Sequence, residues 1–180
     1  MSKYVYVDNS NVWIEGMRVS AVERGLAFDV YDASSRNIVD YDWKYDFGKL
    51  LEIVAGPKNN LKRAVLYGSR PPQNDSLWQA AQQCGFETII MDRNVQNREK
   101  KIDVSITVTI MADSYSLIQN KEEDEMILIA GDSDYVPLVE EVVRRGIKLS
   151  VWFWEHASYE LKKAATSFVA LDPYIDEMRR

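Results

Sequence analysis

The chain has 180 residues, with 28 acidic and 22 basic side chains, which predicts one domain large enough to bury an ordinary core. Its net charge of −6 argues against a protein that coats nucleic acid without specificity, and its single cysteine and single histidine argue against a disulfide, a zinc cage and Cys/His or Ser/His/Asp catalysis. Because no segment resembles a signal peptide or a membrane span, we expect a cytoplasmic protein that does not contact membranes.

The chain opens on an apolar segment that ends at polar residues. Residues 4–7, Tyr-Val-Tyr-Val, predict a short buried strand. Asp8-Asn9-Ser10-Asn11 follows at once, and residues 12–24 have the mixed composition of a helix. The sequence therefore places one carboxylate, Asp8, and one amide, Asn11, at the carboxyl end of the first strand.

Residues 25–46 form the next segment, which we interpret as an accessory insertion. Aromatic side chains alternate with charged ones over residues 38–47, which is the period of a strand. A second strand is expected at 28–32, so the segment is predicted to be a β-hairpin. The hairpin would be set into a strand–helix–strand framework within a single domain that covers residues 1–180.

Helix and strand patterns then alternate through the middle of the chain. Asp46 is expected to cap a helix, and residues 63–67 predict a strand that ends in the Gly-Ser-Arg-Pro-Pro loop containing Arg70. A helix that ends at Gly85 and a strand at 88–91 follow.

The segment 102–118 is ambiguous from its local pattern. Isoleucine and valine alternate strictly with polar residues, which favours a strand. Two parallel strands nevertheless need a crossover between them, and residues 92–125 are the only material available for it. We therefore predict a helix, and its apolar composition indicates deep burial.

Gly131-Asp132-Ser133-Asp134 follows the apolar strand predicted at 126–130. A helix that begins near Pro137 comes next, and the chain ends with strands at 148–154 and 168–171 and a helix capped by Ser158. Because open α/β sheets bind ligands at the carboxyl ends of their strands, we expect Asp8, Asp132 and Asp134 to converge. Carboxylates so close together would repel each other and protonate unless they share a hard cation, and the all-oxygen ligand set favours Mg²⁺ or Mn²⁺.

Three motifs in this order resemble the NYN domain, the LabA-type branch of the PIN-like nucleases. They are Asp8-Asn9-Ser10-Asn11, Lys100-Lys101-Ile102-Asp103 and Gly131-Asp132-Ser133-Asp134. The resemblance implies a Rossmann-like parallel sheet, a helix at 102–118 and Mg²⁺- or Mn²⁺-dependent cleavage of RNA. It also implies a further Asp where this chain has Thr109, which puts catalytic competence in question more than the fold.

The sequence thus predicts a Rossmann-like three-layer α/β sandwich with a mainly parallel sheet of five or six strands. The predicted function is metal-dependent endonucleolytic hydrolysis of single-stranded RNA, and a homo-oligomer is compatible with the sequence. The proposed ligands of the metal and catalytic residues are Asp8, Asp103, Asp132 and Asp134. The proposed contacts to RNA are Asn11, Arg70, Arg98, Lys100 and Lys101.

Three alternatives remain open at this point. The same fold could be an inactive RNA- or protein-binding regulatory module, an interpretation supported by Thr109 and the acidic net charge. A Mg²⁺-dependent phosphohydrolase of a small phosphate ester is the second alternative. At the level of single residues, Tyr135 is either a surface for stacking bases or a residue of the core.

Overall fold

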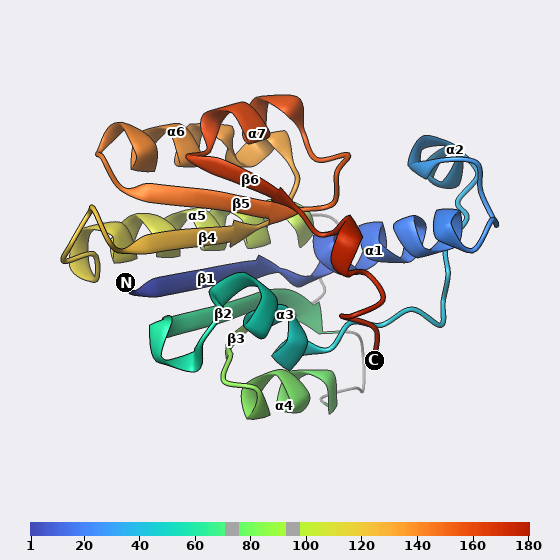
Figure 1. The fold of residues 1–180 in the computed structure, drawn as a ribbon, viewed down its shortest axis with the longest axis horizontal. Helices are drawn as coiled ribbons and strands as arrows, with labels where there is room; N and C mark the ends of the chain where they lie inside the picture. The colour runs from blue at the N-terminus through green and yellow to red at the C-terminus, as the bar shows by residue number, and fades with distance from the viewer. Residues whose placement is uncertain (71–75, 93–97) are drawn as a thin grey trace.

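The structure is a computed structural model that describes residues 1–70, 76–92 and 98–180, the side chains of residues 70, 92 and 98–100 excepted. Within these residues, six strands form one sheet in the order β3-β2-β1-β4-β5-β6, and every neighbouring pair is parallel (Figure 1). The strands are β1 (Lys3–Asp8), β2 (Leu61–Arg70), β3 (Glu87–Asp92), β4 (Glu125–Ile129), β5 (Lys148–Phe153) and β6 (Ser167–Ala170).

Helices cover both faces of this sheet, so the predicted α/β architecture with three layers is confirmed (Figure 1). The part of the chain that the structure describes holds no helix both long and apolar enough to cross a bilayer. The α-helices are α1 (Asn9–Glu23), α2 (Val30–Ser35), α3 (Phe47–Ala55), α4 (Ser76–Gln83), α5 (Arg98–Ser116), α6 (Val136–Arg144) and α7 (Tyr159–Ala164), and a short 3₁₀ helix, η2 (Ser133–Tyr135), precedes α6.

The alternation of side chains along β1 divides the core into two clusters. Val5 and Val7 pack under α1, α3 and α4, whereas Tyr4 and Tyr6 pack under α5, α6 and α7. Successive side chains of a strand point to opposite faces, so Asp8 shares a face with the two tyrosines. The last side chain of β1 is therefore directed toward α5.

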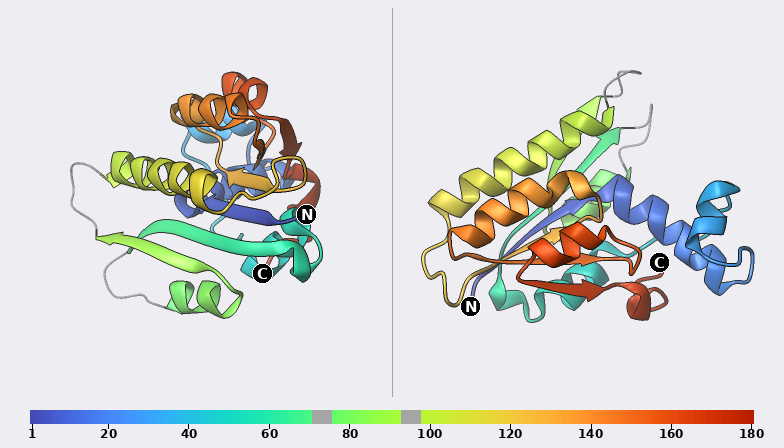
Figure 2. Two further views of the ribbon diagram at one scale, coloured as in Figure 1. Left: turned by 90° about the vertical axis from the view of Figure 1, so that its left-hand side faces the viewer. Right: turned by 90° about the horizontal axis from the view of Figure 1, so that it is seen from above.

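The helix predicted for residues 102–118 is confirmed as α5, but its predicted deep burial is wrong. Ile102, Ile106 and Ile110 are buried against the sheet at a spacing of four residues, whereas Val104 and Val108 are 60% and 61% exposed. The reason is that α5 forms an outer layer and only one side of it faces the sheet (Figure 2). Topology, rather than the local strand pattern, decides this element.

The β-hairpin predicted within residues 25–46 does not form. Asp29 caps α2 by accepting a hydrogen bond from the N–H of Asp32, and the following segment reaches the core without entering the sheet. Trp43 and Tyr45 are buried there, and an isolated bridge links Tyr45 to Arg179. The alternation that resembled a strand reflects an extended segment with one side on the core.

Helix α1 extends away from the carboxyl edge of the sheet, with α2 at its far end (Figure 1, Figure 2). Its packing depends on Gly16, because a Cβ at that position would overlap the ring of Trp43 and lie 2.7 Å from Cζ2 of Trp154. Both rings are fully buried and edge-to-face, with centroids 5.5 Å apart. The absence of a side chain at Gly16 therefore fixes how closely α1 approaches the body of the protein.

Replacing Gly16 with Ala is expected to lower the free energy of unfolding by about 2–3 kcal/mol, because two buried indole rings would have to move. This cost should exceed the gain in helix propensity of about 1 kcal/mol that Gly→Ala provides in a helix interior. Urea denaturation of the two proteins measures the difference. A variant as stable as the original chain would contradict this close packing.

Candidate metal centre at the carboxyl edge of the sheet

Asp8 is the last residue of β1 and the N-cap of α1. One carboxylate oxygen, Oδ1, accepts a hydrogen bond of 3.1 Å from the N–H of Asn11. The residue is only 7% exposed. An aspartate at an N-cap is ordinary, but an ionised carboxylate this buried is costly and requires partners.

A tyrosine hydroxyl connects Asp8 with Asp103. The hydroxyl of Tyr135, in η2, lies 3.2 Å from Oδ2 of Asp8 and 2.9 Å from Oδ1 of Asp103, which is half-buried in α5. The first strand, the central helix and the loop after β4 therefore meet at one point. Two of the four predicted site carboxylates are brought together in this way.

The loop after β4 supplies the other two predicted carboxylates, Asp132 and Asp134, and both are exposed. Oδ1 of Asp132 accepts a hydrogen bond of 3.1 Å from the N–H of Asp134, which caps η2. The side chain of Asn11 accepts the N–H of Gly131 at 2.9 Å and so ties this loop to the start of α1. Asn11 thus connects the start of α1 with the loop that follows β4.

Asp8, at the carboxyl end of β1, has a raised pKa. Burial raises its pKa to about 6, and the nearby charges of Asp103 and Asp132 raise it as well. The N–H of Asn11 and the hydroxyl of Tyr135 act in the opposite direction. Among the described residues, no lysine or arginine side chain forms an ion pair with Asp8 itself.

The donor set fits a hard divalent cation. The side-chain atoms that the structure describes around the hydroxyl of Tyr135 are carboxylate oxygens of Asp8 and Asp103, and Mg²⁺ is commonly held by one or two protein carboxylates while it retains several waters. Within residues 1–70, 76–92 and 98–180, no three acidic, histidine or cysteine side chains are gathered closely enough to hold an ion by themselves. Asp8 and Asp103 would therefore provide the direct ligands, with Asp132 at the exposed rim.

The remaining predicted site residues are the basic residues proposed to contact RNA. Lys101 is exposed near the start of α5, whereas the side chains of Arg70, Arg98 and Lys100 lie outside the described residues. Thr109 donates its hydroxyl to the carbonyl of Ser105 at 2.9 Å, one of the local bonds that threonine commonly makes in a helix.

Tyr135 is a residue whose contribution sequence reasoning missed. It is fully buried, so it cannot stack on a base, and the core interpretation holds. The signal available in the sequence was chemical: a buried tyrosine usually finds a hydrogen-bond partner for its hydroxyl. With Asp134 immediately before it and two other acidic motifs expected nearby, a carboxylate was a natural partner.

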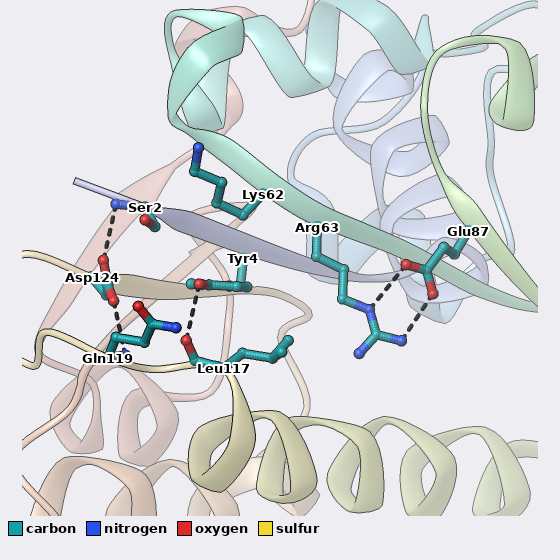
Figure 3. A pocket seen from close by; sticks show the side chains of 8 residues that line it. All are labelled: Ser2, Tyr4, Lys62, Arg63, Glu87, Leu117, Gln119 and Asp124. Atoms are coloured by element: carbon teal, nitrogen blue, oxygen red, sulfur yellow. Dashed lines mark hydrogen bonds and ion pairs between the residues drawn. The ribbon is translucent and has the colours of Figure 1, made fainter.

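A pocket of about 480 Å³ lies at the other end of the strands, near the amino ends of β1, β2 and β3 (Figure 3). Most of its charged side chains already have ion-pair or hydrogen-bond partners. Arg63 pairs with Glu87 at 2.9 Å, and Asp124 accepts the backbone N–H groups of Ser2 and Gln119 at 3.1 and 3.2 Å. These contacts join strand ends and loops, so a structural role accounts for this pocket.

Comparisons with known proteins agree with this architecture. The family model described as the NYN domain matches residues 5–172. A crystal structure of a protein of unknown function from Vibrio parahaemolyticus RIMD 2210633 superposes with a TM-score of 0.65 at 22% sequence identity, over 94% of this chain and 92% of that one. At this identity the likeness concerns the fold alone. No curated protein matches the chain.

Proposed function

From the premise that the chain belongs to the NYN domain family, within the PIN-like nuclease superfamily, we propose that it is a metal-dependent endoribonuclease of single-stranded RNA. The observation that carries the proposal is the environment of Asp8. This buried carboxylate lies in the field of Asp103 and Asp132, and among the described residues no basic side chain pairs with it. A divalent cation would compensate the charge of Asp8.

Each residue of the edge has a distinct part in this proposal. Asp8 and Asp103 would hold Mg²⁺ or Mn²⁺, and the exposed Asp132 and Asp134 would act at the rim of the site. A divalent ion bound there supplies Lewis-acid stabilisation of phosphate charge and an activated water. Asn11, through the N–H of Gly131, keeps the loop that contains Asp132 next to β1.

Basic residues near the start of α5 and the end of β2 provide the proposed contacts to RNA. Lys101 is exposed there, and Arg70, Arg98 and Lys100 belong to the same segments of the chain. Contacts of this kind position the phosphates of a strand without reading its bases. A single strand is the proposed substrate because an extended chain fits an open sheet edge better than a duplex does.

The second candidate is an inactive binding module on the same fold. Two observations favour it: Thr109 stands where the family pattern has a further carboxylate, and no three-carboxylate group is assembled among the described residues. Under this alternative, any binding of RNA would survive chelation of divalent ions and no cleavage would occur.

Incubation of labelled single-stranded RNA with the protein tests the proposal. Cleavage is expected with Mn²⁺ or Mg²⁺, should stop on addition of EDTA and should return when excess metal is restored. A generic phosphate monoester in a parallel reaction separates a phosphohydrolase from a nuclease. RNA left intact at all metal concentrations would favour the inactive module.

A further inference from the structure

The hydroxyl of Tyr135 is a polar group that lies deep in the core of the protein. The ring is 0% exposed and belongs to the core cluster beneath α5 and α6. Packing alone would be satisfied by phenylalanine, and a buried hydroxyl costs free energy unless it is hydrogen-bonded. The contacts of this hydroxyl with Asp8 and Asp103 therefore explain why a tyrosine occupies the position.

The chemistry of the hydroxyl limits what these contacts can be. A phenol has one proton to donate, yet two carboxylate oxygens lie within 3.2 Å of it. At any moment it can donate to only one of them. Because its ring is fixed in the core, the hydroxyl keeps its place between the two carboxylates and can donate to either of them.

We infer that Tyr135 is a positioning residue, which orients the carboxylates of Asp8 and Asp103 toward a shared divalent ion. This inference rests on the proposed function. It gives Tyr135, which lies between β1 and α5, a positioning role and does not add a further ligand of the metal. Groups that orient metal ligands in this way typically contribute 10- to 100-fold to metal affinity or activity. Tyr135 also follows Asp134 directly in the chain, so the same buried ring anchors the loop that contains Asp132.

Tyr6 provides a matched control for this hydroxyl. Its ring is likewise 0% exposed, and its hydroxyl donates to an aspartate, Oδ2 of Asp113, at 2.7 Å. Asp113 is ten residues beyond Asp103 in α5, which corresponds to about 15 Å along the helix axis, and it pairs with Arg63 at 2.6 Å. A Tyr6→Phe substitution thus removes the same kind of bond away from the carboxyl edge.

The test compares Tyr135→Phe with Tyr6→Phe by three measurements: thermal melting in EDTA, Mn²⁺ affinity by titration calorimetry, and RNA cleavage as a function of Mn²⁺ concentration. Both variants should fold and melt within a few degrees of each other. Tyr135→Phe should bind Mn²⁺ about 10- to 100-fold more weakly and need correspondingly more metal for cleavage. Tyr6→Phe should bind Mn²⁺ as the original chain does.

Three other results would overturn the inference or the proposed function. Equal Mn²⁺ affinity in Tyr135→Phe and the original chain, with metal-dependent cleavage intact, overturns the positioning role alone. A Tyr135→Phe protein that fails to fold while Tyr6→Phe folds also overturns it, because the hydroxyl would then serve stability. An original chain that neither binds Mn²⁺ nor cleaves RNA overturns the proposed function and this inference together.

Discussion

Replacing Asp8 with Asn is expected to make the metal-free protein more stable while it abolishes RNA cleavage. Asparagine is as good an N-cap as aspartate, so the bond from the N–H of Asn11 should survive. The substitution removes a buried charge whose pKa is raised to about 6, and with it the repulsion from Asp103 and Asp132. A rise of about two pKa units corresponds to about 2–3 kcal/mol of folding free energy at neutral pH.

The gain in stability should depend on pH in a definite direction. Because the pKa of Asp8 is higher in the folded chain than its ordinary value of 3.8, the folded state retains this proton longer as pH rises. The penalty from Asp8 should thus be absent below about pH 4, grow between pH 4 and 6, and be complete above about pH 6. Carboxylates with lowered pKa, such as Asp40 and Asp124, change stability in the opposite direction in both proteins.

Urea denaturation in EDTA at pH 3.5, 5 and 7.5 isolates this contribution as the difference between the two proteins. Asp132→Asn is the matched control, because Asp132 is exposed and the substitution should change stability by less than about 0.5 kcal/mol. If the Asp8→Asn protein were less stable than the original chain at pH 7.5, this would contradict the claim that the ionised carboxylate of Asp8 destabilises the metal-free protein.

Replacing Asp132 with Asn is expected to reduce RNA cleavage at least about 100-fold, as expected for losing an electrostatic group of a metal-assisted reaction. The amide oxygen can still accept the N–H of Asp134, so η2 should keep its start. Folding is therefore preserved while one negative charge at the rim is lost. Cleavage rates at saturating Mn²⁺, together with melting temperatures, separate the two effects.

Glu140 offers a control for the charge change, because it is exposed on α6, in the helix that follows η2. Glu140→Gln removes the same charge without touching the acidic loop and should leave cleavage within about twofold of the original rate. Unchanged cleavage in Asp132→Asn would indicate either a contaminating nuclease or a centre elsewhere in the chain.

The fold was predictable from the sequence wherever topology constrained it. The local pattern of residues 102–118 favours a strand, yet the need for a crossover between β3 and β4 makes it a helix, and the structure confirms this as α5. Residues 25–46 carry no such constraint. Their alternation was interpreted as a hairpin, whereas Asp29 caps α2 and Trp43 and Tyr45 enter the core without pairing into the sheet.

The sequence indicated which acidic residues lie near the carboxyl ends of the strands, but not how they are arranged. The rule that ligands lie at the carboxyl ends of strands selects Asp8 and Asp132, and the resemblance to the NYN domain adds Asp103. The central place of a buried Tyr135 depends on where η2 turns relative to α5, which no local pattern encodes. Metal binding and the catalytic roles stay predictions.

The most direct test of the central claim, that the acidic edge holds a divalent ion, is a Mn²⁺ titration of the metal-free protein followed by calorimetry or electron paramagnetic resonance. The original chain should bind Mn²⁺ with an affinity that is lost in Asp8→Asn, whereas Glu140→Gln should bind as the original does. Equal binding of Mn²⁺ by the original chain and by Asp8→Asn would contradict the claim.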